Sequence, residues 1–307
     1  MKSTTSEDFQ AKASAKQDTE ATRSPLLSIT RRYPVLSYYV VVFAISWGVG
    51  LLALGPGGFT GTTATARTQL WVGGPISLLG PSIAGPLFTG LLYGRAGLRQ
   101  YLSRLLKWRV SAGWYAFALL TAPVITTLSL LARSTPPAIA TANDKIGLLL
   151  TGIALGLVSS PFFEELGWTG FATPELRKHH GVLATGLLMG LLWGLWHYPI
   201  FSASGRSSGS LSPLVFTLLL LFTWLIPYRI LIVWLYDHTH SVLLSVLMHV
   251  PIVTAEFVLS PEGQSPAFIA TSNIIFALAL WLLIAVIFVA SRGRLESTFG
   301  QAPEAAA

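Results

Sequence analysis

The chain contains no cysteine. This absence excludes disulfide bonds, thiol catalysis and zinc sites built on cysteine. Charge is also scarce, because only 11% of the 307 residues are charged, whereas an ordinary soluble domain carries about 25%. Hydrophobic residues make up 52% of the chain. Such a chain has too few charged residues to cover a water-soluble surface, and its composition predicts a polytopic membrane protein.

Long apolar segments dominate what is present. A helix needs about 20 apolar residues to cross a membrane. We therefore predict an all-α bundle of about eight transmembrane helices that encloses a buried Glu/His site. The predicted spans are 35–54, 71–93, 113–132, 146–172, 182–200, 212–236, 241–259 and 268–290. An alternative ends the fourth span near Phe163 and leaves the two glutamates that follow it at the surface.

The two ends of the chain are polar. We predict a disordered cytoplasmic tail at 1–32, the transmembrane bundle at 33–292 and a cytoplasmic C-terminal tail at 293–307. With both termini in the cytoplasm, the inner segments hold 15 lysines and arginines and the outer loops hold 4, as the positive-inside rule requires. The net charge of +7 then reflects the orientation of a multi-pass protein in the cell membrane. The expected partner is the lipid bilayer, not a nucleic acid.

Two glutamates and two histidines inside the predicted spans stand out as candidate site residues. Glu164 and Glu165 are adjacent in SSPFFEELGWTGF, His197 lies in GLLWGLWHYPIF, and His249 lies in LLSVLMHVPIV. A charged group within the bilayer is costly, so such residues usually mark a functional site. A single histidine is explained equally well by a hydrogen bond to a neighbouring helix. The two histidines and two glutamates together favour hydrolytic chemistry.

The two glutamates are expected to have different roles. Adjacent residues of a helix point about 100° apart, so one carboxylate should face the site and the other should support it. A carboxylate in a dry cleft can act as the general base for a water molecule. The alternative role is a structural ion pair with Arg229, the only basic residue within a predicted span. One arginine cannot neutralise both glutamates.

Three motifs on successive apolar segments carry a family resemblance. The order E-E-x-G-W-x-G-F, W-x-L-W-H-x-P and L-M-H resembles the CAAX protease and bacteriocin-processing (CPBP/Abi) family, whose members are intramembrane endopeptidases related to the type II CAAX prenyl endopeptidase. The resemblance covers roughly residues 145–260. It implies that the first glutamate activates water or helps to hold a metal and that the histidine of the second motif joins it. These roles fall on Glu164 and His197.

The chain departs from the family pattern at two positions. The third motif usually continues with asparagine where this chain has Val253 after His249, and the first motif usually ends in arginine where this chain has Thr169. Two polar groups of the usual site are therefore missing. The candidate supporting residues are Trp193, Arg229 and Thr254.

The sequence thus predicts an intramembrane endopeptidase that acts on a membrane-associated peptide or protein. Glu164 is the expected general base and Glu165 its support, with His197 and His249 as metal ligands or oxyanion donors. Glu164 and both histidines would suit Zn²⁺ with water at the open position. A metal-free mechanism, in which the histidines stabilise the oxyanion, stays open.

A non-catalytic membrane protein is the rival hypothesis. A transporter or a bacteriocin-immunity factor could use the same carboxylates and histidines, for example in a proton relay. The sequence shows no internal repeat, which many transporters have. Geometry separates the two hypotheses, because a protease needs Glu164, His197 and His249 around one small space, whereas a proton path would arrange them along the membrane normal.

Overall fold

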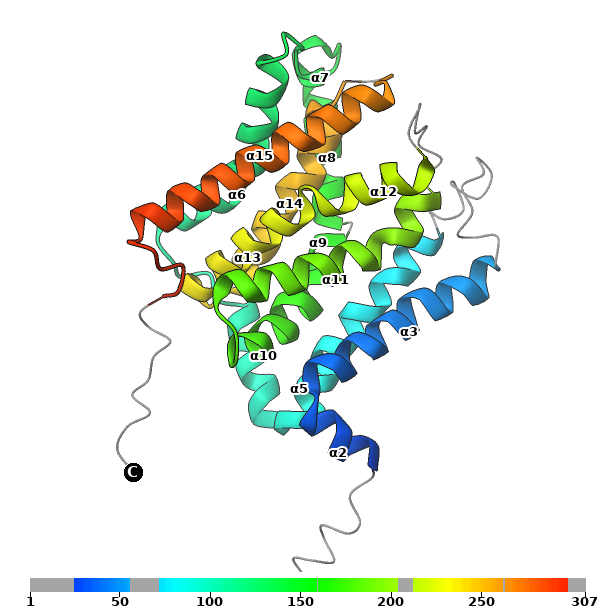
Figure 1. Cartoon of the computed structure of the whole chain (residues 1–307), viewed down its shortest axis with the longest axis vertical. Coiled ribbons are helices and arrows are strands. Elements are labelled where there is room, and N and C mark those ends of the chain that lie inside the picture. Colours follow the sequence, from blue (N-terminus) through cyan, green and yellow to red (C-terminus); the bar gives the residue numbers. More distant parts are fainter. Residues whose placement is uncertain (1–24, 56–71, 159, 204–211, 262, 298–307) are drawn as a thin grey trace, which may run out of the picture.

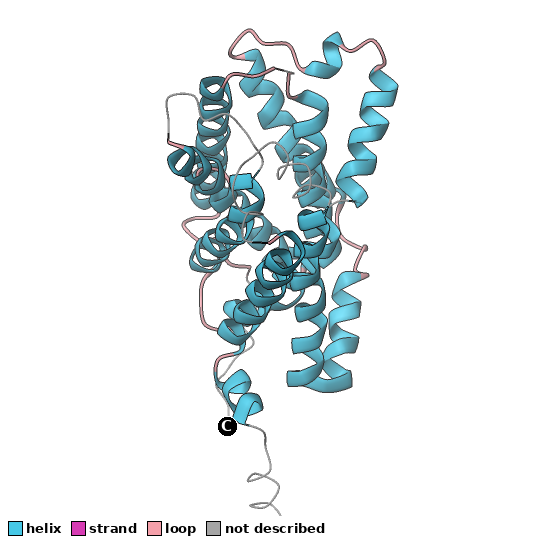
Figure 2. Ribbon diagram, turned by 90° about the vertical axis from the view of Figure 1, so that its right-hand side faces the viewer, coloured by secondary structure: helices cyan, strands magenta, loops and turns pink. Residues whose placement is uncertain are grey.

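The fold is entirely helical. A computed structural model describes residues 25–55, 72–158, 160–203, 212–261 and 263–297. Within these ranges the regular elements are all helices, with no strand (Figures 1 and 2). Seven helices of the described ranges are long and apolar enough to cross a membrane. The predicted all-α transmembrane bundle is confirmed, and the protein is an integral multi-pass membrane protein.

The described ranges contain helices of very different lengths, from 4 to 32 residues. In chain order they are α2 (Pro25–Arg32), α3 (Pro34–Leu54), α5 (Gly74–Leu105), α6 (Ala112–Leu131), α7 (Ala138–Thr141), α8 (Lys145–Val158), α9 (Ser160–Gly167), the π-helical turn η3 (Trp168–Ala172), α10 (Thr173–Arg177), α11 (Val182–Ala203), α12 (Pro213–Phe222), α13 (Leu225–Thr239), α14 (Val242–Leu259) and α15 (Pro266–Ala290). Several begin with proline, whose fixed φ suits the first turn and whose missing N–H leaves no helical bond unmade.

The structure refines the predicted spans. The span predicted at 146–172 corresponds to a single candidate of 33 residues, Lys145–Arg177. Glu164 and Glu165 are both 0% exposed within it, so the alternative that placed them at the surface is wrong. The span predicted at 182–200 forms α11, a helix of 22 residues that is not among the seven candidates of the described ranges.

The N-terminal boundary differs from the prediction. The tail predicted at 1–32 includes α2, an 8-residue helix at Pro25–Arg32. The side chains of Leu26 and Ile29 are exposed on this helix. Residues 1–24 and 298–307, which carry most of the two predicted tails, lie outside the described residues.

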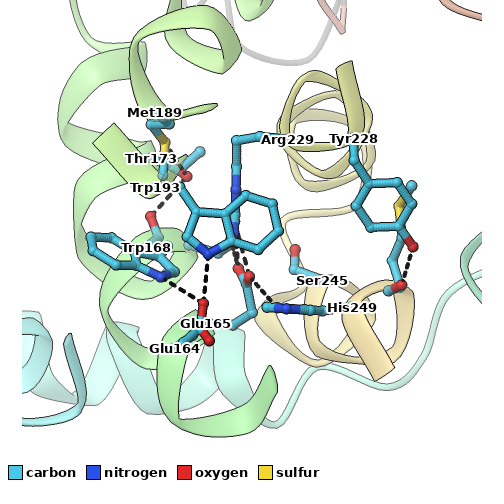
Figure 3. Close-up of polar contacts among 12 residues, drawn as sticks. Glu164, Glu165, Trp168, Thr173, Met189, Trp193, Tyr228, Arg229, Ser245 and His249 are labelled. Carbon is cyan, nitrogen blue, oxygen red and sulfur yellow. Dashed lines mark hydrogen bonds and ion pairs between the residues drawn. The ribbon is translucent and has the colours of Figure 1, made fainter. Parts of the chain in front are cut away.

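Glycines bring α11 and α13 into close contact. A Cβ atom at Gly186 would lie 2.6 Å from the Cα atom of Ile230, and one at Gly190 would lie 2.7 Å from the Cα atom of Ile226. These contacts leave no room for a side chain, which is why small residues recur at such helix interfaces. α13 also packs against α14, and α14 against α8 and α9. The two glutamates therefore lie where α9, α11, α13 and α14 meet (Figures 1 and 3).

A kink in α5 supports the same region from another side. Gly94 has φ +60°, a left-handed conformation that glycine adopts without steric cost, and the helix resumes beyond it. In the second half of α5, the hydroxyl of the buried Tyr101 donates a hydrogen bond of 2.9 Å to the carbonyl of Leu166 in α9. This bond ties α9 to α5 directly beside the glutamate pair.

Candidate active site

Glu164 has one carboxylate oxygen bound and one free of hydrogen bonds. The indole N–H groups of Trp193 and Trp168 donate to Oε2 over 2.6 Å and 3.2 Å (Figure 3). Oε1 is buried and has no hydrogen-bond partner. Its nearest ionisable neighbour is His197, whose Nε2 atom lies 3.8 Å away. A buried carboxylate oxygen without a donor is uncommon in native structures and calls for a ligand or a water molecule.

His197 presents its unprotonated nitrogen to Glu164. Its Nδ1 atom lies 2.9 Å from the carbonyl oxygen of Trp193. A carbonyl oxygen only accepts, so Nδ1 carries the proton of the neutral ring and Nε2 is left as an acceptor. Glu164 Oε1 and His197 Nε2 are then two acceptors that face one space, which suits a molecule that donates twice, such as water. The side chain of His197 is 14% exposed, whereas that of Glu164 is 0% exposed.

Glu165 is fully engaged by other side chains. Nη1 of Arg229 donates to Oε1 and Oε2 over 2.9 Å and 3.0 Å. Nδ1 of His249 donates to Oε1 over 3.0 Å, and the hydroxyl of Thr169 donates to Oε2. Both side chains of the arginine–glutamate pair are 0% exposed. Glu165 therefore holds a fixed negative charge that is balanced inside the bundle, and it has no free oxygen with which to activate water (Figure 3).

Trp193 connects the two carboxylates. Its N–H binds Glu164, and its ring lies 4.2 Å from the guanidinium carbon of Arg229. The same ring meets the rings of His197 and His249 edge-on, with centroids 5.4 Å and 5.2 Å apart. Trp193 thus contacts His197 of its own helix and one polar side chain from each of α9, α13 and α14, and it fixes their relative positions.

The turn after the glutamates carries two of their partners. Trp168 and Thr169 follow Glu164 and Glu165 by four residues each, which places each pair on one helical face. Both belong to η3 and are buried. Short π-helical turns inside α-helices are frequent at functional sites. Neither Thr169, predicted only as the position of a missing arginine, nor Trp168 was among the predicted site residues, although the four-residue spacing could have indicated both.

The predicted residues do not form one cluster of four. Glu164 pairs with His197, and Glu165 pairs with His249. Trp193 and Arg229 lie in the site as predicted supporting residues. Thr254 has a different role, since its hydroxyl donates to the carbonyl of Gly152 over 3.1 Å and so links α14 to α8.

The donor set does not fit the predicted three-ligand zinc site. Within the described ranges, no group of three or more His, Asp or Glu side chains is placed to hold a metal ion. His249 is turned toward Glu165 rather than toward Glu164. Both oxygens of Glu165 already accept from Arg229, and a cation there would meet the positive charge of that arginine.

Comparison with known proteins confirms the family resemblance. The family model described as type II CAAX prenyl endopeptidase Rce1-like matches residues 145–255, which run from α8 into α14 and include every site residue named above. The CAAX prenyl protease 2 of Methanococcus maripaludis is 30% identical over 95 residues, a match that covers 30% of this chain and 35% of that protein. The chain is therefore aligned with about a third of the length of this curated relative.

Proposed function

We propose that this protein is an intramembrane endopeptidase of the CAAX protease type, in which Glu164 activates a water molecule. The observation that carries the proposal is the free oxygen of Glu164, buried and without a hydrogen-bond partner, facing His197 at 3.8 Å. The similarity to a protein named CAAX prenyl protease 2 supports the same reaction class. Glu165 is unsuited to the role of base, because both of its oxygens accept from Arg229.

The chemistry follows from the two facing acceptors. A water molecule beside them donates one O–H to Glu164 Oε1 and the other to His197 Nε2. Glu164 takes a proton as the water oxygen bonds to the carbonyl carbon of the substrate, and the same proton passes to the amide nitrogen as the C–N bond breaks. The indole N–H groups of Trp168 and Trp193 hold the other oxygen of Glu164 and keep its orientation through both steps.

The substrate is proposed to be a membrane-associated peptide or protein. His197 is the partly exposed member of its pair with Glu164, so we infer that the scissile bond approaches past this histidine, from the side of α11. Because the relative is named CAAX prenyl protease 2, a prenylated C-terminal peptide is the first substrate to test. In the proposed orientation both termini lie in the cytoplasm, as the charge distribution predicts.

The grouping of the site favours a protease over a proton path. Glu164, His197, Arg229 and His249 all contact the single side chain of Trp193. Groups arranged around one ring suit a reaction at one place. A relay across the membrane would need them spaced along the membrane normal.

The test is Glu164→Gln in the purified protein. Glutamine keeps the shape and the acceptor for the tryptophans but cannot take a proton, so turnover of a fluorogenic prenylated peptide should fall by about 10²–10⁴-fold. The thermal unfolding midpoint should stay near that of the wild type. Glu256→Gln, an exposed glutamate of α14 outside the site, is the matched control and should retain full activity. A Glu164→Gln protein that cleaves at the wild-type rate would refute the mechanism.

Zinc is the alternative that the sequence left open, and we propose the metal-free mechanism instead. The engagement of Glu165 by Arg229 and the orientation of His249 support this choice. Active protein purified without added metal should contain no stoichiometric zinc by elemental analysis, and a chelator should leave turnover unchanged. One zinc per chain that is lost in His197→Ala, together with the activity, would favour the zinc mechanism.

A further inference from the structure

A cavity that none of the four predicted Glu and His residues lines lies between α5 and α10. It has a volume of about 160 Å³. Five of its lining residues come from one side of α5 on both sides of the Gly94 kink, and the others come from η3 and the α10 region. The lining residues are Thr89, Tyr93, Gly97, Gln100, Arg104, Gly170, Phe171, Pro174, Glu175 and Lys178.

Arg104 brings an unsatisfied cationic group to this cavity. Its Nη1 atom donates to the hydroxyl of Tyr236 over 2.6 Å, and Nη2 donates to the carbonyl of Gly170 over 3.1 Å. Its Nε–H is buried and has no hydrogen-bond partner. A buried guanidinium N–H without an acceptor is unfavourable, and in native structures such a group usually meets a water molecule or an ion.

The other charges of the cavity balance one another. The ammonium of Lys178 donates to both oxygens of Glu175 over 2.7 Å and 2.9 Å, and the hydroxyl of Tyr93 donates to the same oxygens. Burial alone would lower the pKa of Lys178, but its hydrogen bonds to Glu175 and Tyr93 outweigh that effect and raise it. Lys178 and Glu175 therefore remain an ion pair, which leaves the charge of Arg104 uncompensated within the cavity.

The surroundings of the cavity are basic as well. The segment from the Gly94 kink to the start of α6 carries further exposed cationic side chains, and none of these lines the cavity. They are Arg95, Arg99, Lys107 and Arg109. Basic pockets between helices at a membrane surface suit the phosphate groups of anionic lipids. The guanidinium group also has the planar set of donors that phosphate prefers.

We propose that the cavity between α5 and α10 binds a phosphate group, held by Arg104 and supplied by an anionic lipid headgroup or by free phosphate. The bound group pairs with the guanidinium of Arg104, which lines the cavity and whose charge neither Glu175 nor Lys178 balances. Arg104 also holds the carbonyl of Gly170 in η3, the turn that carries the partners of both glutamates. Occupation of the cavity therefore stabilises the turn beneath the candidate active site.

Binding is tested with delipidated full-length protein in detergent, independently of any proteolysis. Native mass spectrometry measures the affinity for phosphatidylglycerol, with phosphatidylcholine as the zwitterionic control lipid. Arg104→Gln should weaken phosphatidylglycerol binding by about tenfold, the effect of losing one charge-assisted contact. Arg99→Gln removes the same charge from an exposed position outside the cavity and should change the affinity by less than about twofold.

A second pair of variants covers a possible folding defect of Arg104→Gln. Gln100→Glu adds a negative charge at the exposed edge of the cavity, whereas Ser103→Glu adds it to an exposed position of α5 that does not line the cavity. Only Gln100→Glu should weaken lipid binding. The proposal is overturned if each cavity variant weakens lipid binding no more than its control does. It is also overturned if neither Arg104→Gln nor Gln100→Glu weakens binding.

The source of the phosphate is separated in a further titration. Inorganic phosphate is added to the delipidated protein while thermal unfolding is followed. A phosphate-dependent rise in the unfolding midpoint that Arg104→Gln abolishes assigns the cavity to a free anion. A rise with phosphatidylglycerol alone, equally sensitive to Arg104→Gln, assigns it to a lipid headgroup.

Discussion

Removal of the buried arginine should destabilise the whole bundle. In Arg229→Met the methionine preserves much of the apolar volume, but Glu165 loses the donor that binds both of its oxygens. Both side chains are 0% exposed, so water cannot replace the arginine. Breaking a buried ion pair by removing one partner costs about 3–5 kcal/mol. Glu165 retains His249 and Thr169 as donors, so we expect the lower end of that range.

The assay is thermal unfolding of the purified variants in one detergent, with a double variant to isolate the cause. Glu165→Gln/Arg229→Met removes both charges and should recover most of the lost stability, because the penalty comes from the unpaired carboxylate. Arg177→Met is the comparison variant, since its pair with Asp237 is more exposed, at 18% and 9%, and should cost less stability than Arg229→Met. Two results would contradict this expectation. One is an unfolding midpoint of Arg229→Met equal to that of the wild type, and the other is a double variant no more stable than Arg229→Met.

Two further predictions concern the candidate site and the topology. Trp193→Phe replaces the indole by a smaller aromatic ring and removes the 2.6 Å hydrogen bond to Glu164, so it should lower kcat by about tenfold. Trp168→Phe removes a 3.2 Å bond to the same oxygen and should lower kcat less. The reverse order in steady-state kinetics would contradict the assigned roles. Reporter fusions at Gln100 and Lys178 should give cytoplasmic signals, because the basic residues are distributed 15 to 4. Fusions at Thr63 and Ser208, which lie outside the described residues, should give external ones. An external signal at Lys178 would reverse the proposed orientation.

Much of the architecture was accessible from the sequence. Apolar segments of about 20 residues must become helices in a bilayer, because no other local structure satisfies the backbone there. The same constraint made Glu164, Glu165, His197 and His249 conspicuous, since ionisable residues are rare in such segments. Three short motifs were enough to indicate the family resemblance. These inferences depend on local composition and spacing, which a sequence contains directly.

Helix geometry alone did not decide which glutamate is free, and only the family resemblance pointed to Glu164 as the base. Glu164 and Glu165 are adjacent and chemically identical, and the angle between them predicts different roles without assigning them. Arg229 lies 64 residues after Glu165 in the sequence, and His249 lies 84 residues after it. Whether they meet the first or the second glutamate depends on how each helix is rotated about its axis. That rotation is set by packing, such as the glycine contacts between α11 and α13.

The sequence by itself thus determined an all-α membrane protein with two glutamates and two histidines in its interior. The helical fold and the interior position of these four residues both follow from the high cost of exposing polar groups to lipid. Only the tertiary structure decided that Arg229 and His249 bind Glu165, and that Trp193 binds one oxygen of Glu164 and leaves the other free. These pairings are not encoded at any fixed spacing, since they arise from contacts between helices that are distant in the chain.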